Sequence, residues 1–309
     1  MEVIYYEGSP INLDTPLSIA LGYFDGLHLA HQEVIERAVA YGRKHNLKSA
    51  VMTFSPNPNV VLKKLESDHL LTPPTEKVRL LETLGVDYLV ILPFDETLAQ
   101  LSATDFVQKY LIDLGVLHVA TGFDFRFGRM GEGDTTFLQQ YPNSFTMSVI
   151  EKRELHDEKI GATQIKNYLS NGMIEKVNLM LGRPYRITGK VVTGAQKGRT
   201  IGFPTANLAL EAPYVIPKKG VYAVKVWIDN HEYMGMCNIG HNPTFNFNND
   251  ISIEVHVLEF EGDLYGQTLQ LDFYHYLRTE KKFPSIDVLM EQLHNDKKEV
   301  KSYFGLDLN

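Results

Sequence analysis

The first half of the chain alternates short apolar runs with runs of helical pattern. The apolar runs are residues 17–21, 49–54, 88–92 and 118–121, and the helical runs between them are residues 32–45, 75–84 and 103–114. Repeated strand, helix, strand order predicts a parallel sheet covered by helices on both faces. Ligands of such sheets bind at the carboxyl ends of the strands, so the residues that follow each strand are candidates for function.

Two histidines stand three positions apart after the first of these strands, in the segment Gly22-Tyr-Phe-Asp-Gly-Leu-His-Leu-Ala-His31. At the start of a helix, His28 and His31 would share one face. Imidazoles beside a helix N-terminus can bind phosphate and stabilise the charge that develops when an α-phosphate is attacked and pyrophosphate leaves. The alternatives are a zinc site, for which no convincing third ligand lies nearby, and two surface histidines without a function.

A glycine-rich turn follows the first strand predicted in the second half. Residues 185–193 read as a strand because β-branched residues alternate there, and Gly194 and Gly198 come next. A flexible loop after a strand can fold over nucleotide phosphates, and Arg199 adds a positive charge to it. The segment is not a Walker A loop, because no Gly-Lys-Ser or Gly-Lys-Thr follows the glycines.

Thr205 and Asn207 lie just beyond this turn. Pro204 fixes one backbone angle and has no N–H, so it holds both residues where hydroxyl and amide oxygens can converge. Such neutral oxygens, together with phosphate oxygens and waters, satisfy magnesium. The alternative is a tight turn between two strands of a barrel, in which both side chains bond only to backbone.

An alternating strand at residues 251–258 carries Glu254 and His256. If the two side chains share the inward face, Glu254 is a candidate base for deprotonating a substrate hydroxyl. The alternative is a solvated strand face.

From about Arg183 to the C-terminus, the order of motifs resembles riboflavin kinase. The matching segments are residues 198–207 (G-R-x-x-G-F-P-T-A-N), 220–223, 238–240, 242–245, 254–256 and 278–283. The resemblance implies a small antiparallel β-barrel with a C-terminal helix. It further implies that Thr205 and Asn207 hold magnesium and nucleotide phosphates, that Glu254 is the general base on the ribityl 5′-hydroxyl, and that Arg278 lies in a mobile loop near the flavin.

Residues 22–31 resemble the G-x-F-D-G-x-H-x-G-H motif of the nucleotidyltransferase superfamily, and specifically the FMN adenylyltransferase module of prokaryotic bifunctional FAD synthetases. Residues 53–58, 122–128, 160–166 and 181–185 support the match. The resemblance implies a Rossmann-like α/β domain with ATP on residues 22–31 and its phosphates on the histidines. The implied nucleotide-binding residues are Gly22, Phe24, Asp25, Gly26, Thr163 and Lys166, and the implied FMN-binding residues are Phe54, Pro56, Phe123, Asp124 and Phe127.

Five positions depart from the usual motifs of this front module: Ala30 replaces glycine, Asn57 histidine, Gly161 and Ala162 two serines, and Lys166 arginine. Ala30 adds a methyl group where backbone is expected to approach the nucleotide. Lysine keeps the charge of arginine but loses its bidentate fork. Three readings therefore remain: a bifunctional enzyme, a riboflavin kinase with an impaired front module, and a flavin-binding regulator.

Length and charge set the remaining expectations. The 309 residues suit two modules, residues 1–182 and 183–309, and the formal net charge of −8 argues against a nucleic-acid-binding surface. Cys237 is the single cysteine, which excludes an internal disulfide and fits a reducing cytosol. We expect a cytoplasmic enzyme without a membrane partner. Its co-substrate is ATP with Mg²⁺, its substrates are riboflavin and FMN, its products are FMN and FAD, and its oligomeric state is open.

Overall fold

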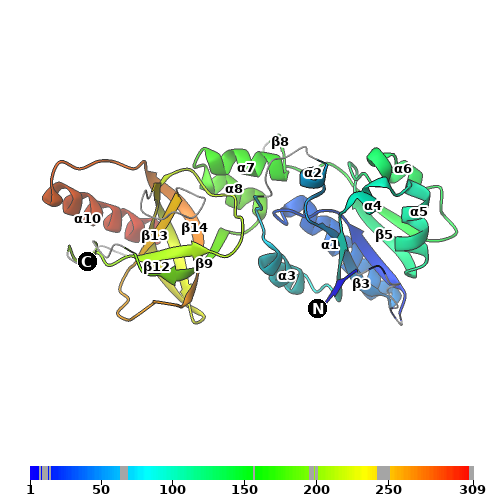
Figure 1. The fold of residues 1–309 in the computed structure, drawn as a ribbon, viewed down its shortest axis with the longest axis horizontal. Coiled ribbons are helices and arrows are strands. Elements are labelled where there is room, and N and C mark those ends of the chain that lie inside the picture. Colours follow the sequence, from blue (N-terminus) through cyan, green and yellow to red (C-terminus); the bar gives the residue numbers. More distant parts are fainter. Residues whose placement is uncertain are drawn as a thin grey trace. The chain divides into compact units, whose positions relative to one another are not determined.

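The computed structural model describes residues 1–6, 8, 13, 15–62, 69–155, 157–194, 198, 201–241 and 251–305. The chain forms two compact units, here called unit 1 (Met1–Ala162) and unit 2 (Thr163–Asn309), and many of their elements are labelled in Figure 1. Contacts group the two helices between residues 162 and 181 with unit 2. The module boundary expected at residues 182 and 183 stays a prediction.

Unit 1 is built on a six-stranded parallel sheet with the strand order β1-β4-β3-β2-β5-β6. Its strands are β1 (Glu2–Tyr5), β2 (Leu17–Leu21), β3 (Lys48–Ser55), β4 (Tyr88–Pro93), β5 (Val116–Gly122) and β6 (Thr146–Ile150). A short antiparallel pair, β7 (Glu154–Leu155) and β8 (Glu158–Lys159), follows.

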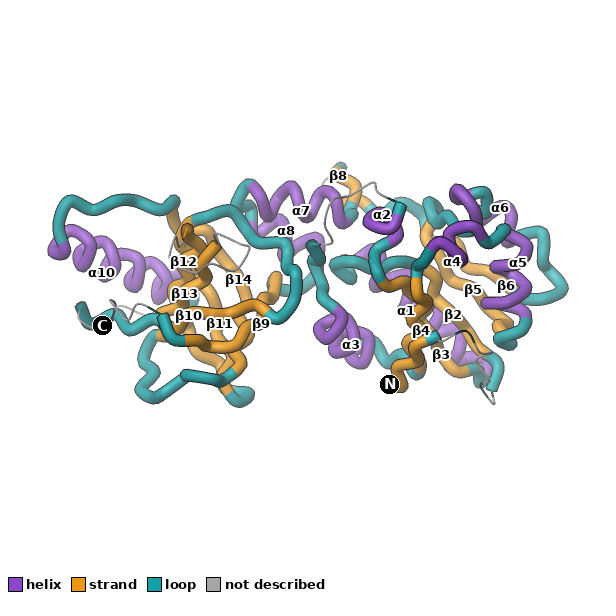
Figure 2. Tube along the Cα trace, in the orientation of Figure 1, coloured by secondary structure: helices purple, strands orange, loops and turns teal. Residues whose placement is uncertain are grey.

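Helices cover both faces of this sheet (Figure 2). They are α1 (Leu29–His45), α2 (Pro58–Val61), α3 (Pro74–Thr83), α4 (Glu96–Gln100), α5 (Ala103–Val107), the π-helical turn η1 (Gln108–Ile112), the 3₁₀ turn η2 (Arg129–Gly131) and α6 (Thr135–Leu138). One buried cluster joins α1 and α3 to the sheet through Ile35 and Leu81, and another joins α5 and α6 to it through Phe106 and Leu138. The parallel sheet with two covered faces predicted from the alternation is confirmed.

The three central strands β3, β2 and β5 are adjacent and parallel, so their carboxyl ends meet at one edge of the sheet. The segments that leave this edge are residues 22–28, which lead into α1, residues 56–57, which lead into α2, and residues 123–127. These are the segments that carry most of the candidate residues of unit 1. The order of the strands is therefore enough to bring these three segments to the same edge of the sheet.

Unit 2 is a closed antiparallel barrel with the strand order β10-β13-β12-β11-β14-β9. Its strands are β9 (Tyr185–Val192), β10 (Ala206–Leu210), β11 (Gly220–Ile228), β12 (His231–His241), β13 (Ile251–Val257) and β14 (Thr268–Arg278), and its helices are α7 (Ala162–Ser170), α8 (Ile174–Leu181) and α10 (Ile286–Tyr303). The fully buried Tyr222 and Phe273 meet edge to face with ring centroids 5.3 Å apart. The barrel and its C-terminal helix are as predicted.

A buried ion pair joins three strands of the barrel. Arg186 on β9 binds Asp272 on β14 through two nitrogens, both at 2.6 Å, and Trp227 on β11 donates to the same carboxylate at 2.8 Å. These hydrogen bonds satisfy a carboxylate that is only 4% exposed.

Among the described residues, no helix is long and apolar enough to cross a membrane.

Candidate active sites

The histidine pair of unit 1 is built around the start of α1. His28 is the N-cap of this helix, and its Nδ1 atom accepts a hydrogen bond from the backbone N–H of His31 at 3.3 Å. The two rings stack with centroids 3.6 Å apart. Because Nδ1 accepts, the neutral His28 ring carries its proton on Nε2, which makes that nitrogen a hydrogen-bond donor. The structure therefore brings the predicted pair together.

His31 is held in its neutral form. Burial lowers its pKa, a positive charge on His28 or Lys77 lowers it further, and a backbone hydrogen bond at Asp25 offsets part of this decrease. Although the residue as a whole is partly exposed, its Nδ1 atom is buried and has no hydrogen-bond partner in the part of the chain that the structure describes. Buried polar atoms are normally satisfied, so this nitrogen is an exception within the site.

The segment from Gly22 to Gly26 keeps its backbone close to the sheet edge. A Cβ atom on Gly22 would lie 2.8 Å from the ring of Phe24, which is itself buried at 2% exposure. Asp25 accepts hydrogen bonds from the backbone N–H groups of Leu71 (2.8 Å) and Thr72 (3.2 Å). The ring of Phe24 and one carboxylate oxygen of Asp25 thus hold the segment in place, while direct nucleotide contacts of these residues stay predictions.

A cavity of about 480 Å³ opens beside this segment. Phe54 and Pro56, predicted on the FMN side, line it together with Asn57, whose side chain caps α2 by accepting from the backbone of Asn59 at 3.0 Å. The cavity is also lined by Tyr23, Thr53, Thr72 and Lys77. Its size suits a flavin ring system better than a water cluster.

The other three predicted flavin residues do not line this cavity. Phe127 is 5% exposed and packs in the core against Phe106 and Phe137, so its placement does not support a flavin contact. Asp124 forms an ion pair with Lys159 at 2.9 Å, and the Lys159 ammonium lies 5.2 Å from the exposed ring of Phe123. The flavin roles of Phe123 and Asp124 stay predictions.

The sequence reasoning missed Lys77, a cavity-lining lysine of which only 8% is exposed. It lies in α3, three residues after Pro74, the first residue of that helix. In the sequence, nothing distinguishes this lysine from the lysines that an amphipathic helix usually carries. Thr163 and Lys166, predicted to bind nucleotide phosphate, lie on α7. That helix groups with unit 2, so their relation to the histidine pair stays a prediction.

In unit 2, the barrel brings three predicted residues together. Asn207 on β10 pairs directly with Glu254 on β13, and the hydroxyl of Thr205 donates to a Glu254 carboxylate oxygen at 3.5 Å. Asn238 on β12 is the partner of Glu254 on its other side. Because directly paired residues of antiparallel strands point to the same face, the two amides flank the carboxylate. Sequence order separated these residues by up to 49 positions.

Glu254 and His256 share one face of β13, but it is the half-buried one. The fully buried face consists of Ile253, Val255 and Val257, so the inward orientation considered for Glu254 and His256 is wrong. Their actual face leaves the carboxylate accessible to a substrate. The backbone carbonyl of Pro204 contacts His256 Nδ1 at 2.8 Å, which anchors the segment before Thr205 to β13.

The environment of Glu254 makes it a stronger base than a free glutamate. Burial raises its pKa, the negative charge of Glu280 raises it further, and the hydrogen bond from Thr205 offsets part of this increase. A carboxylate with a raised pKa accepts a proton more readily. The geometry therefore supports proton abstraction at this position.

Two glycines, Gly194 and Gly198, lie close to Asn207 and Phe203. A Cβ atom on Gly194 would lie 2.1 Å from the amide nitrogen of Asn207, and one on Gly198 would lie 2.1 Å from the carbonyl oxygen of Phe203. Only glycine permits these approaches. Arg199 and the motif at residues 242–245 lie outside the described residues.

A Gly194→Ala variant is therefore expected to displace the Asn207 side chain. It should also lower kcat/KM for the riboflavin phosphorylation that the sequence resemblance implies, roughly tenfold to a hundredfold, the cost of one charge-assisted contact. Steady-state assays with Gly161→Ala as control check this, because a Cβ atom at Gly161 meets no atom within 4 Å among the described residues. Equal activities of the two variants would contradict the proposed fit between Gly194 and Asn207.

Arg278 does not lie in a mobile loop, and that expectation is wrong. It is the last residue of β14 and binds Asp296 of α10 through two nitrogens, at 2.9 and 2.7 Å. Asp296 is 1% exposed and also accepts from Gln292 at 2.8 Å. Arg278 thus fixes the C-terminal helix to the barrel, and its flavin contact stays a prediction.

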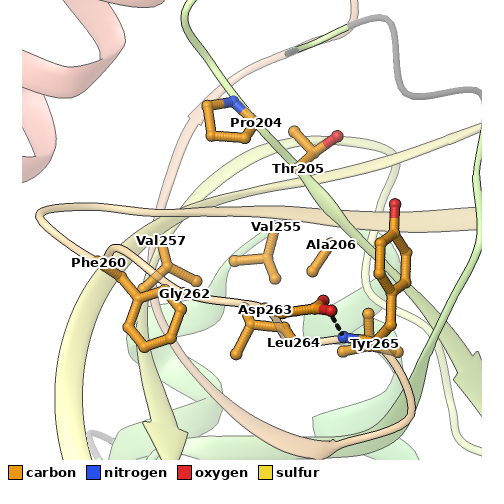
Figure 3. Close-up of a pocket in the computed structure, with 11 residues that line it drawn as sticks. Pro204, Thr205, Ala206, Val255, Val257, Phe260, Gly262, Asp263, Leu264 and Tyr265 are labelled. Atoms are coloured by element: carbon orange, nitrogen blue, oxygen red, sulfur yellow. Dashed lines mark hydrogen bonds between the residues drawn. The ribbon is translucent and has the colours of Figure 1, made fainter.

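A shallow hollow of about 70 Å³ adjoins Thr205 (Figure 3). It has an apolar floor that includes Val255 and Val257, and Phe260 and Tyr265 stand at its sides. Asp263 accepts from the backbone N–H of Tyr265 at 3.0 Å, which shapes the turn that closes the hollow. Sequence reasoning missed this feature because its residues come from three separate segments.

Comparisons with known proteins match both halves of the chain. The FAD synthetase family model matches residues 11–164, and the riboflavin kinase model matches residues 181–304. Relatives named bifunctional riboflavin kinase/FMN adenylyltransferase include one from Listeria monocytogenes, 39% identical over 99% of both chains. Another, from Bacillus subtilis, is 41% identical and covers 93% of this chain and 92% of its own.

A solved structure from Streptococcus pneumoniae has the same fold, with a TM-score of 0.90, 32% identity, and coverage of 97% of this chain and 99% of its own. That protein bears the name macrolide-efflux protein, whereas both family models and the curated relatives above name flavin-nucleotide enzymes. The Listeria and Bacillus relatives are more than 30% identical to this chain over nearly its whole length, which establishes family membership. The chain belongs to the bifunctional riboflavin kinase/FMN adenylyltransferase family.

Proposed function

We propose that unit 2 phosphorylates riboflavin to FMN with ATP, and that unit 1 transfers the adenylyl group of a second ATP to FMN to give FAD. The observation that carries this proposal is the convergence of Thr205, Asn207 and Glu254 on one face of the barrel. Phosphoryl transfer depends mainly on positioning and charge neutralisation; this arrangement would supply the positioning, and magnesium held by its neutral oxygens would supply the positive charge.

In unit 2, Glu254 takes the proton of the ribityl 5′-hydroxyl. The oxygen then forms a bond to the γ-phosphorus of ATP, and the bond to the β-phosphate oxygen breaks to release ADP. The hollow beside Thr205 would hold the adenine, because an apolar floor and an aromatic side suit a flat base. Gly194 leaves room for the Asn207 side chain, and Gly198 leaves room for the carbonyl of Phe203.

The oxygens of Thr205 and Asn207 fit magnesium, which takes a few neutral protein oxygens besides phosphate and water. Bound there, magnesium would neutralise phosphate charge. Among the described residues, no group of three or more histidine, cysteine, aspartate or glutamate side chains could hold a metal ion. Phosphate oxygens and waters would be the other ligands of the proposed site.

In unit 1, an oxygen of the FMN phosphate forms a bond to the α-phosphorus of ATP, and pyrophosphate leaves. The Nε2–H of His28 and the ring of the neutral His31 would contact the phosphates during this step. Phe54 and Pro56 would hold the flavin in the cavity.

The second candidate is a riboflavin kinase with an impaired unit 1. It is favoured by Gly161, Ala162 and Lys166, which replace the serines and arginine usual in such modules. A flavin-binding regulator is disfavoured by the assembled base and hydroxyl of unit 2. We further propose a cytoplasmic enzyme whose partners are small molecules, not nucleic acid or membrane; its oligomeric state is open.

Product analysis distinguishes the candidates. The purified protein receives ATP and magnesium with either riboflavin or FMN, and the flavins are separated by chromatography. We expect FMN and then FAD from riboflavin, and FAD from FMN. FMN that accumulates without FAD would establish the second candidate, and no product from either flavin would favour the regulator.

A further inference from the structure

Lys77 is a buried cation in the wall of the unit 1 cavity. It lies on α3, is 8% exposed, and shares the cavity wall with Phe54 and Pro56. Lysine is rarely buried to this extent without a specific reason, because removing its charge from water is costly. The buried position therefore needs an explanation.

The ammonium group is held at the segment that joins β2 to α1. Its Nζ atom donates to the backbone carbonyl of Tyr23 at 2.9 Å and lies 4.9 Å from the centroid of the Tyr23 ring. Thr53 donates to the same carbonyl, also at 2.9 Å. Lys77 is thus fixed where the cavity meets the segment that leads to the histidine pair.

The charge of Lys77 also acts on the histidine pair. After burial and His28, the charge of Lys77 is the next largest cause that lowers the pKa of His31. At neutral pH, His31 is uncharged, so Lys77 supplies fixed positive charge beside a neutral imidazole. An anion attached to a molecule in the cavity gains from this charge.

We propose that Lys77 binds the 5′-phosphate of FMN and positions it beside the histidine pair. The proposal rests on the adenylyltransferase function of unit 1 and adds a residue that selects phosphorylated over unphosphorylated flavin. The ammonium is a compact phosphate-binding charge, and its hydrogen bond to Tyr23 orients it. The bound phosphate oxygen then attacks the α-phosphorus of ATP, and pyrophosphate leaves with the electron pair of the broken bond.

The test compares Lys77→Gln, Lys77→Met and Lys77→Arg with the exposed control Lys44→Gln. FAD formation gives KM for FMN and for ATP, and 5′-deoxyriboflavin serves as a neutral competitor that the kinase unit cannot phosphorylate. We expect KM for FMN to rise roughly tenfold to a hundredfold in the Gln and Met variants, as for one lost charge-assisted contact. The inhibition constant of 5′-deoxyriboflavin should stay within about twofold, and Lys77→Arg should restore most FMN affinity.

A parallel rise in KM for FMN and in the inhibition constant of 5′-deoxyriboflavin would overturn the proposal, because Lys77 would then only shape the cavity. A rise in KM for ATP alone would overturn it in favour of triphosphate binding. If the wild-type protein forms no FAD, the function proposed for unit 1 fails, and calorimetric titration still decides on Lys77. In that case, weakening of one FMN site in the Gln variant supports phosphate binding, and unchanged FMN isotherms contradict it.

Discussion

A Glu254→Gln variant is expected to lose riboflavin phosphorylation by about 10²- to 10⁴-fold in kcat, the usual contribution of a general base. Glutamine keeps the size of the side chain and can still accept the hydrogen bond from Thr205, but it cannot take the proton of the 5′-hydroxyl. FAD formation from supplied FMN should continue, because unit 1 does not use this residue. Chromatographic assays with riboflavin and with FMN check both statements.

The exposed Glu211→Gln is the matched control and should leave both activities unchanged. The pH dependence gives a second readout. Since the base acts only when deprotonated, and since burial and Glu280 raise its pKa above the ordinary 4.5, kinase kcat should fall as the pH drops through a value above 4.5. Wild-type turnover in Glu254→Gln would remove Glu254 as the base.

The sequence predicted the elements that packing determines most strongly. The central strands of unit 1 are mostly apolar because both of their faces are covered, as in β2, whose five residues are all buried. The edge strands β1 and β6 were not predicted: β1 is only four residues long, and polar Thr146 and Ser148 interrupt the apolar residues of β6. The helix expected over residues 103–114 becomes α5 followed by a π-helical turn, a change of hydrogen bonding that periodicity does not reveal.

In the candidate sites too, the sequence predicted local contacts and missed contacts that depend on packing. His28 and His31 could be paired from their spacing alone, because three positions on a helix face fix their proximity. Lys77 could not, because its contact with Tyr23 spans 54 positions and depends on how α3 packs. Similarly, Arg278 could not be distinguished from a loop residue until α10 placed Asp296 beside it. Residues joined by tertiary packing need the fold, whereas residues joined by local geometry do not.

A His28→Asn variant is expected to lower kcat for FAD formation by about 10²- to 10³-fold, the usual loss when one donor to a developing oxyanion is removed. Asparagine is chosen because its side-chain oxygen can still cap α1 by accepting from the His31 backbone, as His28 Nδ1 does at 3.3 Å. What it removes is the Nε2–H donor and the ring stacked on His31. Saturating FMN and ATP are used, so that the loss appears in kcat.

Riboflavin phosphorylation by the same preparation should stay within about twofold, and His45→Asn at the exposed end of α1 is the matched control for FAD formation. A cap that is preserved should leave the unfolding midpoint of His28→Asn near that of the wild type, since cap loss alone costs about 0.5–2 kcal/mol. Because folding and chemistry are thus separated, a variant that unfolds normally and forms FAD at the wild-type rate would show that His28 only caps the helix. Normal unfolding with slow FAD formation is the result that places His28 on the reacting phosphates.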